Sequence, residues 1–208
     1  MSYDVLVDSY RSRVRELLDK NNDAYLLYAA LELRCGVETR MKEFLEPLHH
    51  IPKSQRREYA IGKLGKSIST AFQITDQLAL FTIVFPETND EITLRYVPIP
   101  KRLQEIASKL GDVLHYIGER NAEDPNWWQR LRSLLEEGYE WFAYVASGDL
   151  IGVPLLNTKN RTTHLRMFLW ADDPRSQIAG RLTQGAKHII RVAYEPIPKV
   201  PPNSNSDA

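Results

Sequence analysis

Apolar residues recur at helical spacing along most of the first 75 positions of the chain. The spacing predicts a first helix that ends near Asn21, a second over 24–48 and a third over 54–74. The second carries apolar residues around most of its circumference, so we expect it to be central and largely buried. Gly62 and Gly65 weaken the third helix and predict a kink in its middle.

The pattern changes to strands over 80–85 and 92–97, two runs rich in Ile, Val, Thr and aromatic residues. A turn-forming segment at 86–90 separates them, which predicts a β-hairpin. Helical spacing then returns. Pro100 begins a fourth helix that ends near Gly118, and Asp124 with Pro125 begins a fifth that ends at Gly148.

Beyond Gly152 the pattern predicts strands over 164–170 and 187–194, with a short helix over 174–184 between them. The predicted fold class is α+β, predominantly α. It is an antiparallel helical bundle over 1–148 with an inserted hairpin at 78–97. A small C-terminal β-containing part, 149–195, would pack on this bundle, and the tail over 196–208, rich in Pro, Ser and Asn, is predicted to be disordered.

The 208 residues include 27 Lys and Arg and 27 Asp and Glu, so the whole chain has no electrostatic bias toward nucleic acid or an anionic membrane. Cys35 is the single cysteine, which excludes an internal disulfide and favours a reducing compartment. The charged N-terminal region does not resemble a secretory signal, and no apolar run approaches the ~20 residues of a membrane span. We therefore expect a cytoplasmic protein that does not bind membranes.

Positive charge is concentrated in one short segment opposed by Glu58 alone; its residues are Lys53, Arg56, Arg57, Lys63 and Lys66. Such a run predicts contacts with the phosphates of a nucleic acid. The alternative is a solvated face that balances acidic residues elsewhere. A second basic concentration extends from Lys159 to Arg191 and has the same two interpretations.

Residues 60–67 differ by one position from the phosphate-binding pattern GxxxxGK[ST], because Ala60 stands at the first glycine. A buried strand should lead into that loop, and the segment before Ala60 is polar, so we expect no nucleotide binding. The five histidines lack metal-ligand spacing, and neither a metal nor another cofactor is predicted.

Charged residues interrupt the predicted central helix, where Arg34 and Glu38 have the spacing of an ion pair. Asp112 and His115 lie one turn apart on the predicted fourth helix. If the two helices pack, these four side chains could converge in a site. The alternative is a structural polar network.

The stretch 27–39, together with 110–115, resembles uncharacterised bacterial proteins with a HEPN-like helical core, over roughly residues 20–148. The resemblance implies an antiparallel helical bundle, often dimeric, from toxin and antiphage systems. Many such proteins are metal-independent RNases with an arginine and, four to six positions later, a histidine. Arg120 with Asn121 matches the start of that pattern, but no histidine follows.

Three hypotheses follow for the function. The first is a non-catalytic HEPN-like module that binds RNA or a protein in a bacterial defence or toxin–antitoxin context, with a homodimer as one assembly. The second is an RNase or other hydrolase that uses Arg34, Glu38, Asp112, His115 and Arg120. The third is a small-molecule sensor with a pocket between the second and fourth helices.

Overall fold

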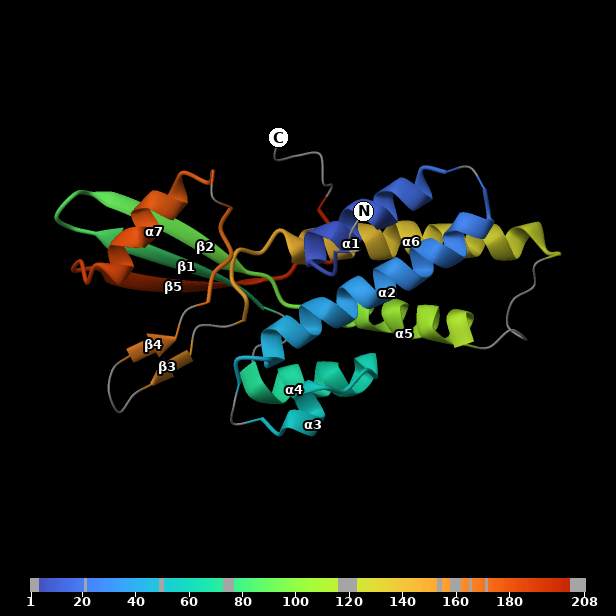
Figure 1. Cartoon of the computed structure of the whole chain (residues 1–208), viewed down its shortest axis with the longest axis horizontal. Helices are drawn as coiled ribbons and strands as arrows, with labels where there is room; N and C mark the ends of the chain where they lie inside the picture. Colours follow the sequence, from blue (N-terminus) through green and yellow to red (C-terminus); the bar gives the residue numbers. More distant parts are fainter. Residues whose placement is uncertain are drawn as a thin grey trace. The chain divides into compact units, whose positions relative to one another are not determined.

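A computed structural model describes residues 4–20, 22–48, 51–72, 77–115, 123–152, 155–157, 162–164, 166–170 and 172–202. The fold is α+β and predominantly helical, as predicted. Its elements are α1 (Val7–Leu18), α2 (Ala24–Leu45), α3 (Lys53–Arg56), α4 (Ile61–Phe72), β1 (Gln77–Phe85), β2 (Asp90–Tyr96), α5 (Lys101–His115), α6 (Pro125–Ala146), β3 (Leu155–Asn157), β4 (Thr162–His164), α7 (Arg175–Thr183) and β5 (Ile189–Pro196) (Figure 1).

The chain forms two compact units. The helical unit comprises Met1–Thr75, Ile99–Ala146 and Pro198–Ala208, and the β unit comprises Asp76–Pro98 and Ser147–Ile197. This division differs from the predicted boundary at residue 148. The hairpin does not belong to the bundle, because β1 pairs along its length with β5, a strand that is distant in sequence.

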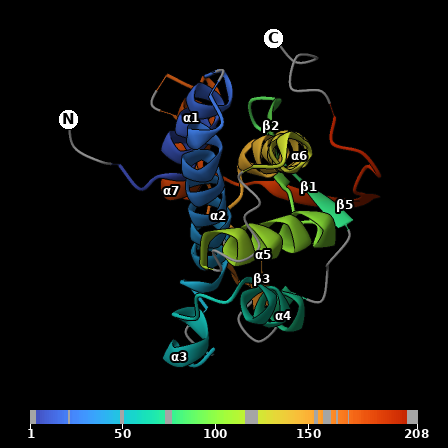
Figure 2. The same cartoon turned by 90° about the vertical axis from the view of Figure 1, so that its right-hand side faces the viewer.

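The helical unit is built around α2, which contacts α1, α4, α5 and α6. In Figure 2, α5 and α6 lie next to each other on one side of α2. Apolar side chains on one side of α2 are fully buried, among them Leu26, Leu33, Met41 and Phe44. The prediction of a central second helix is therefore confirmed, but α2 is not buried around most of its circumference, since Tyr28 and Leu31 are exposed. The helix ends at Leu45 and not at Leu48.

The predicted third helix over 54–74 is wrong near its start, and the kink predicted at Gly62 and Gly65 does not occur there. Two helices, α3 and α4, are separated by residues 57–60. The cause is Glu58, whose carboxylate accepts hydrogen bonds from the backbone N–H groups of Tyr59 (2.9 Å) and Ala60 (3.2 Å). Such local side-chain to backbone bonds compete with helix formation. Gly62 and Gly65 lie inside α4 and do not break it.

The β unit contains an antiparallel sheet in the order β2-β1-β5. Phe81 on β1 lies opposite Leu94 on β2 and Val192 on β5. The predicted hairpin is confirmed. Its turn includes Asn89, which has a φ of 56°, a left-handed conformation that asparagine tolerates better than most residues.

The C-terminal predictions are confirmed in part. The strand over 187–194 corresponds to β5, and the short helix over 174–184 corresponds to α7, which contacts β2. The strand over 164–170 is wrong. Within the described residues, β4 ends at His164, and Met167 makes only an isolated bridge with Leu150. The predicted end of the fourth helix, near Gly118, and the last six residues of the predicted tail lie outside the described residues.

Candidate functional site

The basic run predicted from sequence lies on α3, on α4 and between these consecutive helices. Lys53 lies on α3, Arg57 follows α3, and Lys63 and Lys66 lie on α4. All four side chains are exposed. We call these four residues the α3–α4 basic surface. The helices α3 and α4 contact each other, and Lys63 and Lys66 line a common hollow.

Arg56 behaves differently from the other four basic residues. Its guanidinium donates hydrogen bonds to the backbone carbonyls of Ile51 (3.1 Å, from Nε) and Glu46 (3.0 Å, from Nη1). These carbonyls belong to the C-terminal end of α2 and the segment after it, where helix carbonyls lack intrahelical partners. Arg56 therefore holds the α2–α3 connection in place, and the expectation of a purely solvated basic face is wrong at this position.

A hollow of about 710 Å³ lies at the α3–α4 basic surface. Lys63 and Lys66 line it, together with the polar side chains of Gln55, Ser67 and Thr70. Ammonium, amide and hydroxyl groups all donate hydrogen bonds to phosphate oxygens. The hollow thus combines positive charge with the donors that a phosphate group requires.

Glu58 contributes the one carboxylate that lines this hollow. Hydrogen bonds from the backbone of Tyr59 and Ala60, and then from Lys63, lower the pKa of Glu58. Its ion pair with Lys63 spans 3.2 Å. At neutral pH the carboxylate is charged and offsets part of the positive potential of the hollow. Glu58 pairs with Lys63 and not with Lys66, the other lysine that lines the hollow.

Residues 61–67 of the near-match to GxxxxGK[ST] form the first turns of α4. The backbone N–H groups of Lys63 and Leu64 donate to the carbonyl of Ala60, as in an ordinary helix. This segment contains no loop that could wrap a phosphate, and it follows α3 in place of a strand. The geometry gives no support to a nucleotide site of that type.

The predicted polar cluster is only partly assembled. Arg34 and Glu38 form an ion pair of 3.3 Å, with 16% and 17% of their side chains exposed. Lys42, one turn farther along α2, also binds Glu38. Arg34 packs directly against Gly111 on α5, where an added Cβ would lie 2.8 Å from Arg34 Nε. The arrangement is a row of ion pairs along α2. This corresponds to the structural polar network that the sequence analysis gave as the alternative to a site.

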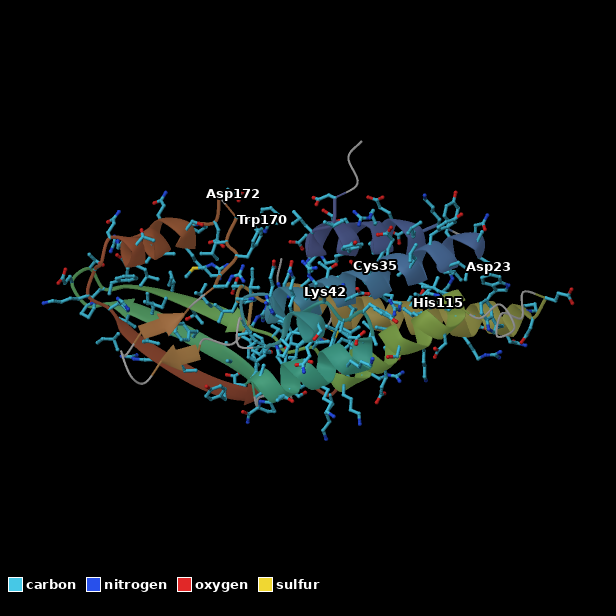
Figure 3. The ribbon with its side chains drawn as sticks, turned by 60° about the horizontal axis from the view of Figure 1, so that its bottom comes forward. Asp23, Cys35, Lys42, His115, Trp170 and Asp172 are labelled. Carbon is cyan, nitrogen blue, oxygen red and sulfur yellow. The ribbon has the colours of Figure 1, made fainter. Side chains whose placement is uncertain are left out.

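Asp112 and His115 are exposed on α5. Among the described residues, neither forms a hydrogen bond or ion pair with Arg34 or Glu38. Figure 3 shows His115 on α5 and Cys35 with Lys42 on α2. Arg120, the fifth residue of the predicted cluster, lies outside the described residues. The described members therefore do not form a joint acid–base site.

Cys35 gains no nucleophilic character from its surroundings. Burial raises the pKa of its thiol, and the neighbouring carboxylates of Glu38 and Glu32 raise it further. A reactive cysteine requires the opposite shift. In the part of the chain that the structure describes, no three His, Cys, Asp or Glu side chains are grouped to hold a metal ion.

The predicted small-molecule pocket between the second and fourth helices corresponds to the contact of α2 with α5, where Arg34 packs against Gly111. A second hollow, of about 450 Å³, lies elsewhere, along α6 beside Asn126, Arg130 and Glu137. Neither this hollow nor the one at the α3–α4 basic surface is lined by α2 and α5 together.

No protein-family model matches this sequence. The comparisons with curated proteins and with solved structures likewise gave no match. The HEPN-like resemblance therefore remains a prediction. Among the helices of the described residues, none has the length and apolar character to cross a membrane.

In the β unit, sequence reasoning missed a structural role for two residues of the second basic concentration. Arg175 donates to Asp149 (2.9 Å) and Asp173 (2.7 Å), and Arg181 binds Asp90 on β2. These cations are paired within the unit. Arg166, Lys187 and Arg191 are exposed, whereas Lys159 and Arg161 lie outside the described residues.

Proposed function

We propose that this protein is a non-catalytic, HEPN-like binding module that binds RNA through the α3–α4 basic surface. The observation that carries the proposal is the hollow of about 710 Å³ lined by Lys63, Lys66 and neutral hydrogen-bond donors. Lys53 on α3 and Arg57 directly after it are also exposed. The resemblance adds a bacterial defence or toxin–antitoxin context to this proposal.

Charge is the main source of the expected affinity. A whole chain with equal numbers of acidic and basic residues attracts RNA only where cations are concentrated. Lysines contact phosphates as point charges and do not read base edges, so binding should depend weakly on sequence. Glu58 limits the strength of this surface because its carboxylate pairs with Lys63.

The RNase alternative is not supported by an assembled site among the described residues. Asp112 and His115 are exposed and separate from the Arg34–Glu38 pair, so these groups do not provide a positioned acid and base. A protein partner in place of RNA would use the same surface only if it presented acidic or phosphorylated groups. RNA presents such groups at every nucleotide.

The test is a titration of labelled single-stranded RNA of mixed sequence at several salt concentrations. If all four cations contact phosphates, the logarithm of the binding constant should fall with the logarithm of salt with a slope of about −3. A denaturing gel of the same samples should show intact RNA. Absence of binding at low salt would overturn the proposal. RNA cleavage that disappears in His115→Ala would refute its non-catalytic part.

A further inference from the structure

The strand β5 is exposed along its whole length. Among the described strands β5 is next to β1 alone, so it is an edge strand, and all eight of its residues are exposed. Four of them are large and apolar, with exposed fractions of 38–54%: Ile189, Ile190, Val192 and Tyr194. A long, apolar edge strand is a template for pairing with another strand.

The backbone hydrogen bonds of β2 determine which peptide groups of β5 are free. The N–H of Arg95 donates to the Asp149 carboxylate (3.1 Å), and its carbonyl accepts from the N–H of Leu150 (3.0 Å). Both groups therefore point away from β1. The N–H and carbonyl groups of successive residues in a strand point to opposite neighbouring strands. The backbone groups of Leu94 and of its partner Phe81 therefore point toward each other across the β1–β2 ladder.

The same alternation continues across β1 to β5. Since the backbone groups of Phe81 point to β2, those of its neighbours Leu80 and Thr82 point to β5. There Leu80 pairs with Ala193, and Thr82 pairs with Arg191. Val192 must then direct its N–H and carbonyl groups to the open edge. Ile190 and Tyr194 do so as well, and among the described residues no hydrogen bond is made to the backbone groups of these three residues.

The opposite edge of the sheet is covered. Besides the two bonds that Asp149 and Leu150 make with Arg95, the Arg175 guanidinium donates to the Thr93 carbonyl (3.3 Å). One edge of the β unit is thus closed by its own chain, and the β5 edge is open. Proteins usually protect such an edge with charges, bulges or a covering segment.

We propose that β5 pairs antiparallel with β5 of a second copy of this chain, with the two-fold axis at Ala193. This register places Val192 opposite Tyr194 of the partner subunit, and these residues exchange the hydrogen bonds of their free peptide groups. The side chains of Val192 and Tyr194 lie on the sheet face of Phe81 and Ala79. Each of the two symmetric pairs joins an aromatic side chain to a β-branched one, a favourable cross-strand combination.

Charge complementarity favours this register over the one with the two-fold axis at Val192. With the axis at Ala193, Arg191 lies opposite Glu195 of the partner subunit, which gives two symmetric ion pairs. An axis at Val192 would place Arg191 opposite an alanine and Glu195 opposite Ile189. Ala193 itself would face Ala193 of the partner subunit in a pair without hydrogen bonds, where strands approach most closely and a small side chain fits.

Charge reversal in the full-length protein tests the register. Sedimentation equilibrium of the wild type should give twice the chain mass of 24.0 kDa. Arg191→Glu should weaken dimerisation about tenfold or more, because it places like charges opposite each other in two pairs. Adding Glu195→Arg should restore the dimer. A monomeric wild type at high concentration would overturn the proposal, as would a double variant no tighter than Arg191→Glu.

Two further variants test the edge itself. Val192→Pro should give a folded monomer, because it removes an N–H that points to the open edge and leaves the β1 ladder intact. Ala193→Cys should form an intermolecular disulfide on oxidation, since opposite Cα atoms in a pair without hydrogen bonds are about 4.5 Å apart, within the range that a disulfide spans. The wild type, with Cys35 alone, is the control. A dimeric Val192→Pro, or no cross-link beyond that of the wild type, would contradict the proposal.

Discussion

Gly36 on α2 and the ring of Phe142 on α6 are so close that a Cβ atom on Gly36 would lie 2.6 Å from the ring. Phe142 is fully buried, so the ring has little room to move. Tyr10 on α1 adds a contact of 2.9 Å at the same point. The absence of a side chain at Gly36 allows three helices of the helical unit to meet.

Gly36→Ala should destabilise the helical unit by about 1–3 kcal/mol, because the added methyl group overpacks this junction. Gly62→Ala is the matched control. No atom lies within 4 Å of a Cβ at Gly62 on α4. That change should stabilise the unit by about 0.5–1 kcal/mol through its helix propensity. Thermal unfolding followed by circular dichroism measures the stability of both variants. Equal effects of the two changes would contradict the close packing of α1, α2 and α6 at Gly36.

Arg56→Gln should destabilise the helical unit by about 1–2 kcal/mol, because the carbonyls of Glu46 and Ile51 lose a charged donor. Arg57→Gln removes an exposed cation of the same type. Its effect should stay within about 0.5 kcal/mol. Urea unfolding of the two variants makes the comparison. Equal stabilities would show that Arg56 has no role in holding the α2–α3 connection.

Glu58→Gln should strengthen RNA binding at low salt, because it removes the carboxylate that pairs with Lys63 in the hollow. The glutamine carbonyl can still accept from the N–H groups of Tyr59 and Ala60, so the start of α4 should be retained. We expect an increase in affinity of only a few-fold, since an ion pair with an exposed lysine is weak. Unchanged affinity in a folded variant would place the bound RNA away from the hollow.

The β unit should loosen in acid. A side-chain hydrogen bond from Arg175 lowers the pKa of Asp173 below its ordinary value. A carboxyl whose pKa is lower in the folded state stabilises that state above the ordinary pKa of about 3.9. This contribution is lost as the pH falls from there through the lowered pKa.

Hydrogen exchange of the amides of α7 and β2 measures this loosening as a function of pH. At neutral pH, Asp173→Asn should lower the protection factors of these amides, which compare their exchange with the intrinsic rate at each pH, and it should reduce the further fall of these factors in acid. Asp172, the exposed neighbour shown in Figure 3, provides the control through Asp172→Asn. An acid response unchanged in Asp173→Asn would contradict the role given to the Asp173–Arg175 pair.

Local pattern in the sequence predicted most helices and the hairpin, because an apolar face at helical or alternating spacing determines each of them. It did not predict that β1 pairs with β5, since no local period records a contact between residues more than a hundred positions apart. It also did not predict the break at 57–60, where the Glu58 carboxylate binds nearby N–H groups.

For the candidate site, sequence identified the five cations but not their different roles. Nothing in a run of basic residues distinguishes Arg56, which binds backbone carbonyls, from exposed Arg57. The spacing of Arg34 and Glu38 correctly suggested an ion pair. The convergence of Asp112 and His115 with that pair depended on the rotation of α5 about its axis, which the spacing on each helix does not determine.

The location of RNA binding tests the central claim most directly. Fluorescence anisotropy of labelled RNA should be compared for the wild type, Lys63→Glu with Lys66→Glu, and a control that carries Lys20→Glu with Lys109→Glu. Both double variants change the net charge by the same amount, and the control lysines are exposed on other parts of the helical unit. The account predicts at least about tenfold weaker binding for the first variant and a much smaller loss for the control. Equal losses, or binding unchanged in the first variant, would contradict it.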